Sequence, residues 1–549
     1  MSQSESTKPP QNHLLARLEE LNAIGIALSN ERDTSRLLDS ILIAAKRITN
    51  ADAGTLYLLD DEQQALKFEI IRTDTLAIAM GGTTGEPITF YPILLHDAEG
   101  KPNHNMVVAH AALSGRTVNI PDAYKAEGYD FSGTKNFDNK TGYRSTSLIA
   151  VPMRNHENEL IGVLQLINAQ DRESGNIVSF SAQDQSLLES LASQAAIALT
   201  NHLLIQQMER LFESFISLIN TAIDDKSAYT GGHCERVPVL TMMLADAVNR
   251  TQQGPLKDFV MTEKDRYELK IAGLLHDCGK ITTPVHVVDK STKLETIFDR
   301  IHLIDTRFEV LKRDAEINML HALMKPGISV ADEQRIRAEF NAYKQQLDSD
   351  RDFLRHSNVG SERMEAEDQE RVHRISKYTW CNELGEEAYF LNAEELENLN
   401  IRAGTLTEAE RQIINHHIDI TIKMLESLPW PKHLRKVSEY AGGHHERMDG
   451  KGYPKGLTRE QMSVQARVMG IADIFEALTA KDRPYKRGKT LTESLAILGK
   501  FKENGHIDPD LFDVFVREKV YLSYAQQYLD EEQIDEVNEA LIPGYSKVL

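Results

Sequence analysis

The segment HHERMDGKGYP, His444–Pro454, places two adjacent histidines in front of a turn that contains two glycines and a proline. Both imidazoles are polar and partly charged near neutral pH, so packing alone gives little reason to place them side by side. Neighbouring side chains on a helix diverge by about 100°. We therefore expect His444 and His445 to be ligands that straddle a centre of two metal ions.

Other histidines and aspartates in the same half of the chain support this interpretation. Two occur in apolar, helix-patterned stretches, LLHDCGK and GIADIFEAL, where a buried polar side chain without a partner would be costly. Imidazoles and carboxylates that converge on metal ions satisfy one another. A lone histidine is usually an ordinary surface or core residue, but five separate segments are hard to explain by packing. The remaining two segments are GGHCERV, around His233, and IINHH, which ends at His417.

Composition excludes several classes of protein. The 549 residues are enough for two to four domains at about 150 residues each. With 62 basic and 83 acidic residues the net charge is -21, which disfavours sequence-independent binding to nucleic acid polymers. Three cysteines without a CxxC pair make disulfide scaffolds and thiolate zinc sites unfavoured. The sequence contains no apolar run long enough for a membrane span and no signal-peptide pattern at its start, so we expect a cytoplasmic protein.

The sequence pattern changes along the chain. A polar tail and a helical stretch precede short strands, GTLYLLD, ALKFEII, STSLIAVPM and LIGVLQLIN, the last two joined by a polar turn typical of a hairpin. A long helical run to about Ile223 follows, and then almost only helix-patterned sequence. This predicts a multidomain fold: an α+β domain, a connecting helix and a large all-α domain. The expected bounds are 1–30 for the tail and first helix, 31–200 for the α+β domain, 201–223 for the connecting helix and 224–549 for the all-α domain.

An insertion of residues 291–405 separates the second and third ligand segments. Its helical periodicity and dense charge predict a helical hairpin packed beside the metal-binding bundle. A lid or a partner surface remains open as its role. Its histidines share no spacing and are expected to be structural or exposed: His302, His321, His356 and His373.

The motifs HDCGK, HHERMDGKGYP and ADIFEALTAKDRPYK resemble those of the HD-GYP family of bacterial cyclic-dinucleotide phosphodiesterases. HHERMDGKGYP matches the pattern HHExxDGxGYP at every specified position. The resemblance spans about 224–290 and 406–515. It implies an all-helical HD fold that cleaves the 3'-5' phosphodiester of cyclic di-GMP to pGpG or GMP. It also implies two divalent ions, iron or manganese, with Asp277 as the bridging carboxylate, held by His233, His276, Asp277, His417, His444, His445 and Asp473.

Cations near the ligand segments are expected to contact the substrate. Lys280 follows His276 by four residues and, if the helix persists, lies on the same face and reaches the phosphate. Asp277 and Lys280 are the expected catalytic residues. The two metal ions of such a centre are expected to lower the pKa of a bound water and to polarise a phosphoryl oxygen. Arg483 and Lys486 in DRPYK offer further charge for phosphate binding.

The turn itself and one departure from the family pattern refine the expected site. Tyr453 is expected to contact substrate, and Asp449 to orient a ligand histidine. Some HD-GYP proteins bind a third metal through Glu in an ETGxH segment. Here YTGGH places Tyr229 at that position, which favours a dinuclear site.

The strands around Ser145 resemble the later strands of cyclic-nucleotide-binding GAF domains, a family of small-ligand or dimerisation modules. The family's N-K-F-D-E signature is matched in part. Cyclic-nucleotide binding, another small ligand and pure dimerisation all remain open. The helix from 184 to 223 has heptad-like leucines and isoleucines, so we expect it to pair with its twin in a homodimer and to couple the domains. The matching residues are Asn168, Phe180 and Asp184, and the departures are Ala169 and Gln185.

Three functions are therefore considered. We favour an active cyclic di-GMP phosphodiesterase under GAF control, because every expected ligand except the third-site Glu is present. A phosphohydrolase acting on 3',3'-cGAMP or on a nucleotide would have the same ligand set. A non-catalytic signalling scaffold is the third, although such members usually lose ligands.

Overall fold

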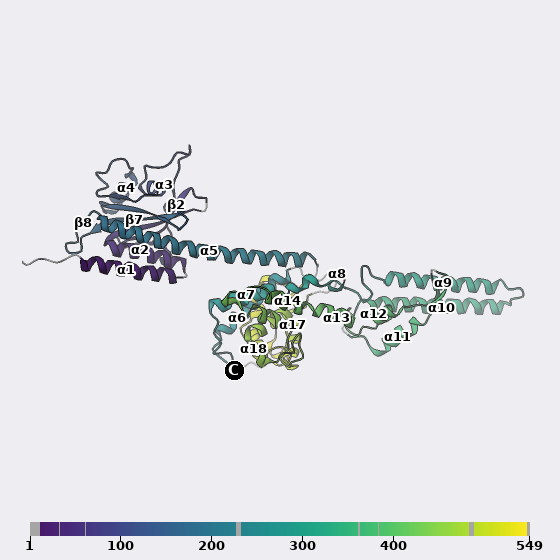
Figure 1. Ribbon diagram of the computed structural model, residues 1–549. Helices are drawn as coiled ribbons and strands as arrows, with labels where there is room; N and C mark the ends of the chain where they lie inside the picture. Colours follow the sequence, from purple (N-terminus) through teal and green to yellow (C-terminus); the bar gives the residue numbers. More distant parts are fainter. Residues whose placement is uncertain are drawn as a thin grey trace, which may run out of the picture. The chain divides into compact units, whose positions relative to one another are not determined.

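The computed structural model describes the chain apart from residues 1–10, 32, 61, 227–231, 361–362, 383, 482–487 and 546–549. It divides into two compact units, Met1–Leu211 and Phe212–Leu549 (Figure 1). Within the described residues, every helix is too short or too polar to cross a membrane.

An antiparallel sheet forms the centre of the N-terminal unit. Its described strands follow the order β3-β2-β1-β7-β6-β5, with β4 beside β2 and β8 beside β7. The predicted hairpin is confirmed, since β6 and β7 pair with Val151 opposite Leu164. The strands are β1 (Ala51–Leu59), β2 (Ala65–Thr73), β3 (Ile78–Gly81), β4 (Ile93–Leu94), β5 (Val118–Ile120), β6 (Leu148–Arg154), β7 (Leu160–Gln170) and β8 (Ile177–Val178).

Helices cover both faces of this sheet. Because successive strand residues point to opposite faces, Leu56 joins the core under α1 (Gln11–Asn30), α2 (Thr34–Thr49) and α5 (Ala182–Lys226), whereas Tyr57 joins the core under α3 (Val107–Ser114). The helix α4 (Ser132–Thr141) lies on the same side of the sheet as α3 (Figure 1). The predicted first helical stretch is divided in two, because Asp33 caps α2 by accepting a hydrogen bond from the Arg36 backbone N–H. The expected α+β architecture is confirmed.

The residues that match the GAF signature stabilise local structure in this unit. The Asn168 side chain accepts a hydrogen bond from the Thr146 backbone and donates one to the Arg144 carbonyl. Phe180 is buried in the core, and Asp184 accepts from Ser181 at the start of α5. At the two departures, Ala169 is buried in β7 and Gln185 donates to Glu189. A ligand for this unit therefore stays a prediction.

A helical bundle forms most of the C-terminal unit. Its core includes Leu244, Leu269, Phe475 and Phe515, contributed by four different helices. The bundle helices are α6 (His233–Arg250), α7 (Glu263–Leu275), α8 (Val285–Val288), α13 (Glu408–Asn415), α14 (His417–Glu426), α15 (Val437–Gly442), α16 (Val464–Thr479), α17 (Leu491–Glu503), α18 (Pro509–Arg517) and α19 (Val520–Tyr528). Single 3-10 turns in the chain are η1 (Gly82–Thr84), η2 (Cys278–Thr282), η3 (Lys432–Leu434), η4 (Arg459–Gln461), η5 (Glu531–Gln533) and η6 (Glu539–Leu541).

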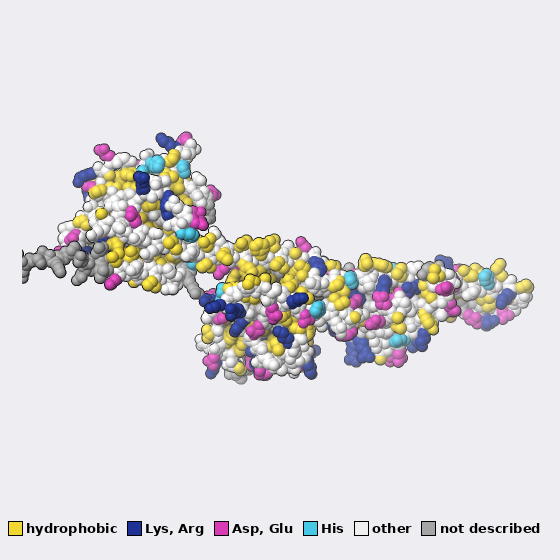
Figure 2. Space-filling model, viewed as in Figure 1, with side chains coloured by type: hydrophobic (Ala, Val, Ile, Leu, Met, Phe, Trp, Pro, Cys, Tyr) yellow, Lys and Arg dark blue, Asp and Glu magenta, His cyan; other side chains and the backbone are white. Residues whose placement is uncertain are grey.

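The insertion folds around a hydrophobic core of its own, which includes Phe308, Leu354 and Phe390. The predicted hairpin is α9 (Ile301–Leu323) packed on α10 (Val330–Asn358), followed by α11 (Ala366–Ser376) and α12 (Ala393–Leu399). A small antiparallel pair, β9 (Thr379–Cys381) and β10 (Glu387–Tyr389), departs from the all-α expectation. Acidic and basic side chains alternate over its surface (Figure 2), and its four histidines are exposed.

Hydrogen bonds and an ion pair connect the two ends of the insertion to each other and to the bundle. The Thr405 hydroxyl donates to the Lys290 carbonyl over 2.9 Å. The buried Lys290 ammonium lies 2.8 Å from the Glu410 carboxylate on α13, one helix before His417. The chain therefore leaves and re-enters the bundle at one point.

Candidate metal centre

The structure brings all seven proposed ligands together from five elements. His233 begins α6, His276 and Asp277 directly follow α7, and His417 begins α14. His444 and His445 follow α15, while Asp473 lies within α16. Helix ends and the turns after them supply six of these side chains, which lets them converge from different directions.

Asp277 lies at the middle of this cluster. One of its oxygens, Oδ2, is 3.2 Å from His233 Nε2 and 3.3 Å from His276 Nε2. The other oxygen, Oδ1, is 3.2 Å from His417 Nε2. The two oxygens thus face different histidines, as a carboxylate that bridges two cations must do.

Two groups of ligand atoms flank Asp277. In each, the potential ligand atoms lie within 4.8 Å of one another. One comprises His233, His276 and Asp473; the other comprises His417, His444 and His445. His444 also forms a group with His276 and Asp277, so it lies between the two sides of the cluster.

The helical angle assumed for His444 and His445 does not apply, because both residues follow the end of α15 at Gly442. That the two histidines straddle two metal ions stays a prediction. Their ring centroids are only 4.2 Å apart, with an interplanar angle of 39°. Adjacent histidines here supply ligand atoms to the same group.

The imidazoles have the hydrogen-bonding pattern of metal ligands. In His276, His417 and His444, Nδ1 pairs with a backbone carbonyl three residues earlier, at 2.8, 2.5 and 2.6 Å. This assigns the proton to Nδ1 and leaves the Nε2 lone pair facing the cluster. Within the described residues, the Nε2 atoms of these histidines and of His233 are buried without a hydrogen-bond partner, as is Asp277 Oδ1. Buried polar atoms in this state fit divalent transition-metal ions.

Electrostatics favour neutral His444 and His445 and charged carboxylates here, whereas the carboxylates around His233 outweigh the effect of burial and raise the pKa of that imidazole. Burial is the main reason that the pKa of His444 lies well below its usual value, and burial lowers the pKa of His445 to about 4. Burial by itself would raise the pKa of Asp277, but the charge of Lys280 and the neighbouring histidines outweigh it and lower that pKa. The same balance, with His233 as the main group that opposes burial, lowers the pKa of Asp473.

Lys280 differs from its expected geometry. The helix does not persist, since α7 ends at Leu275 and η2 begins at Cys278. The Lys280 ammonium lies 2.5 Å from Asp277 Oδ2, and Asp277 and Asp473 raise its pKa against the opposing effect of burial. Its contact with phosphate stays a prediction. Arg483, Lys486 and Tyr229 lie outside the described residues.

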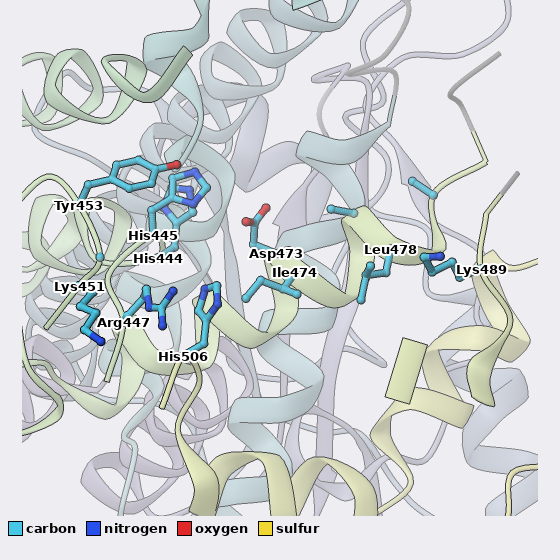
Figure 3. A pocket seen from close by; sticks show the side chains of 13 residues that line it. His444, His445, Arg447, Lys451, Tyr453, Asp473, Ile474, Leu478, Lys489 and His506 are labelled. Atoms are coloured by element: carbon cyan, nitrogen blue, oxygen red, sulfur yellow. The ribbon is translucent and has the colours of Figure 1, made fainter. Parts of the chain in front are cut away.

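A pocket of about 460 Å³ opens beside the cluster (Figure 3). Tyr453 lies in its wall and stacks on His445, with ring centroids 4.9 Å apart. Asp449 does not contact a ligand histidine as expected; its carboxylate accepts two hydrogen bonds from Arg447. The lining residues are His444, His445, Arg447, Lys451, Gly452, Tyr453, Asp473, Ile474, Ala477, Leu478, Ala480, Lys489 and His506.

Sequence reasoning missed one carboxylate. Buried Glu476 accepts a hydrogen bond from His233 Nδ1 and another from Arg236, the latter over 2.7 Å. It thereby orients His233, whose Nδ1 pairs with a side chain, whereas the Nδ1 atoms of His276, His417 and His444 pair with backbone carbonyls. A usable signal existed: Glu476 follows Asp473 by three residues in an apolar helix, so both face the same side. Arg447, Lys451, Lys489 and His506 were also missed, and only their place in the pocket identifies them.

Comparison with known proteins agrees with both units. The GAF domain model matches residues 33–199, and two HD domain models match residues 230–369 and 392–511. A solved GAF domain from an Acinetobacter phosphoenolpyruvate-protein phosphotransferase covers 35% of this chain and 98% of its own, at 17% identity and a TM-score of 0.26, too low to add to the family match.

Curated relatives match part of the chain. A cyclic di-GMP phosphodiesterase of Pseudomonas aeruginosa is 37% identical over 116 residues, which are 21% of this chain and 27% of that protein. The 3'3'-cGAMP-specific phosphodiesterase 1 of Vibrio cholerae is 44% identical over 81 residues, 15% of this chain and 19% of that protein. The chain thus matches less than a third of either relative's length. The chain is a GAF domain followed by an HD domain that bears the HD-GYP motif.

Proposed function

We propose that the C-terminal unit hydrolyses the 3'-5' phosphodiester of cyclic di-GMP to pGpG, GMP or both. One observation carries the proposal: four buried Nε2 atoms and Asp277 Oδ1 converge without hydrogen-bond partners among the described residues. That donor set suits two iron or manganese ions. The name of the relative from Pseudomonas aeruginosa supports cyclic di-GMP as the substrate.

The ligand residues and the pocket divide the work of this reaction. Bound divalent ions would lower the pKa of a water and polarise the phosphoryl oxygen. Backbone carbonyls hold His276, His417 and His444 in the required tautomer. Lys280 places a positive charge beside Asp277, where charge develops on the phosphoryl oxygens, and Tyr453 forms the wall on which the substrate lies.

A second candidate substrate is 3',3'-cGAMP. Two relatives from Vibrio cholerae named as specific for it are 44% and 39% identical over their matched segments. The proposed ligand set would serve both substrates, because the bond cleaved is of the same kind.

The long helix α5 supports a homodimer. Six of its exposed apolar residues, together with Asn201, recur at alternating steps of four and three, which is the spacing of a coiled-coil seam. Asn201 occupies the same series, and a single Asn in such a seam specifies register. We propose that two copies of α5 pair in parallel through Ile197, Leu204, Met208, Leu211, Phe215 and Leu218.

The end of α5 offers a route of regulation. The Asn220 amide donates to the Leu274 carbonyl over 2.9 Å, and Lys226 donates to the Lys280 carbonyl over 3.4 Å. These acceptors flank His276 and Asp277. We propose that a small molecule bound by the GAF domain changes the conformation of α5 and, through it, the positions of these metal ligands.

The exposed free Cys381 is consistent with a reducing compartment, and we propose that the protein acts in the cytoplasm.

A turnover assay tests the function. The full chain, loaded with iron or manganese, is incubated with cyclic di-GMP, 3',3'-cGAMP and cyclic di-AMP, and the products are separated. Cleavage of cyclic di-GMP, lost in the His276→Ala and Asp277→Ala variants, supports the proposal. Metal-loaded protein that cleaves none of the three would refute it, and faster cleavage of 3',3'-cGAMP would favour the second candidate.

A further inference from the structure

The pocket beside the metal centre has an apolar wall that starts at a ligand. Ile474, Ala477 and Leu478 line it, and all three belong to α16, the helix that carries Asp473. Residues three and four apart share a helix face, so this wall extends outward from the ligand along one side of α16 (Figure 3). Such a surface suits the face of a planar, heteroaromatic ring.

A guanidinium lies in the same pocket in a fixed orientation. Arg447 donates from Nε to Asp449 Oδ1 over 3.0 Å and from Nη2 to Asp449 Oδ2 over 2.8 Å. Asp449 is held in turn, because its backbone N–H donates to the Gly505 carbonyl over 2.9 Å. Asp449 occupies one edge of the guanidinium. The neighbouring edge keeps its donors, since Nη1 donates no hydrogen bond to any residue that the structure describes.

An imidazole lies beside this arginine in the pocket (Figure 3). His506 stacks on Phe501, with centroids 4.5 Å apart and an interplanar angle of 23°. The Met448 backbone N–H donates to the His506 carbonyl over 3.3 Å, which ties this loop to the turn that carries Arg447. Burial and the charge of Arg447 lower the pKa of His506, which favours the neutral ring with its one donor and one acceptor.

We propose that this pocket is a guanine site, in which Arg447 donates to O6 and N7 of a base lying against the α16 wall, with His506 at its edge. The inference rests on the proposed function and specifies its base preference. Guanine presents two acceptors on this edge, whereas adenine presents the N7 acceptor and an N6 amino donor. Because arginine has only donors, it repels that amino group. Cyclic di-GMP is therefore preferred to cyclic di-AMP.

Kinetics on two substrates test the assignment. The metal-loaded full chain and its Arg447→Met and Arg447→Lys variants are assayed for kcat/KM on cyclic di-GMP and cyclic di-AMP. The kcat/KM for cyclic di-GMP divided by that for cyclic di-AMP should fall by about 5- to 100-fold in Arg447→Met. This is the range for one bidentate contact to a base. Arg447→Lys should lose nearly as much, because an ammonium lacks the planar fork.

Lys451→Met is the matched control, since Lys451 lines the same pocket but carries no fork. It should change kcat/KM for both substrates alike and preserve the ratio. An unchanged ratio in both Arg447 variants, or equal losses on the two substrates, would overturn the guanine site and assign Arg447 to phosphate.

Two further measurements keep the test decisive. Arg447→Met could lose metal if the turn that carries it loosens. In that case Arg447→Lys and His506→Phe test the site, and both must lower the kcat/KM for cyclic di-GMP relative to that for cyclic di-AMP. Calorimetric titration of wild-type protein and Arg447→Lys with the two dinucleotides separates this inference from the proposed function. A guanine preference in binding that the variant loses supports the site even without turnover. Equal binding of the two dinucleotides by wild-type protein refutes it, whatever the enzyme cleaves.

Discussion

Replacing Gly279 with alanine should separate the two sides of the metal centre. Gly279 lies in η2, two residues after Asp277, and packs directly against the start of α14. A Cβ built on it would lie 2.0 Å from the His417 backbone oxygen and 2.7 Å from the Thr421 backbone nitrogen. Real Cβ contacts essentially never fall under 3.0 Å, so η2 and α14 must move apart by about 1 Å.

This displacement acts on the bridging carboxylate. Asp277 Oδ1 now lies 3.2 Å from His417 Nε2, across the boundary that the new methyl group would widen. A misplacement of about 1 Å can cost roughly 100-fold in rate. Overpacking of this kind should also cost about 1–3 kcal/mol of stability. We therefore expect Gly279→Ala to fold, to bind about one metal ion per chain and to lose about 100-fold in kcat.

Metal analysis, thermal unfolding and turnover of cyclic di-GMP measure these three effects. Gly133→Ala is the control, because a Cβ at Gly133 meets no atom within 4 Å and its backbone needs no positive φ. Parental metal content and kcat in Gly279→Ala would show that this contact does not set the ligand spacing.

Four other perturbations test separate parts of the structure. Glu476→Gln should weaken metal affinity by about 10- to 100-fold, measured by competition with a chelator, because it removes the charged partner of His233; unchanged affinity would contradict that role. Lys280→Ala, Arg483→Ala and Lys486→Ala should each lower kcat/KM by roughly ten- to a hundredfold with metal content retained, and parental rates would refute the proposed phosphate contacts. Leu211→Asp should convert a dimer to monomers in light scattering, since Leu211 is 58% exposed in the proposed seam, whereas Glu209→Asp, off the seam, should not. Removal of the metal with a chelator should lower the unfolding temperature, and an unchanged temperature would argue against bound metal in the folded protein.

Sequence patterns predicted the elements whose period is strong. The β6–β7 hairpin, the α9–α10 hairpin and the division into an α+β and a helical unit all follow from alternation or helical spacing. The β9–β10 pair was missed because its three-residue strands are too short to show a period. The first helix breaks at Asp33, whose capping side chain competes with helix continuation.

The site shows a similar limit. Residue types and motif spacing identified the ligand candidates, and the structure brings them together, but helical geometry was assumed where the chain turns. His444 and His445 follow α15, and Lys280 follows the end of α7, so their directions depend on turns rather than on helical angles. Glu476 was missed although it follows Asp473 by three residues in α16, because its partner His233 lies 243 residues earlier in the chain and no motif joins the two.

The contact between the two ends of the insertion affects the order in which the C-terminal unit can fold. Lys290 and Thr405 are 115 residues apart, and a flexible segment of that length would have to close before Asp277 meets His417. The insertion has its own core, so it can fold first and shorten the loop to roughly ten effective residues, which lowers the entropic cost by about 2 kcal/mol. The ion pair between Lys290 and Glu410 then forms when the insertion is already folded. A large insertion between two halves of a metal centre thereby behaves, for chain closure, like a short turn.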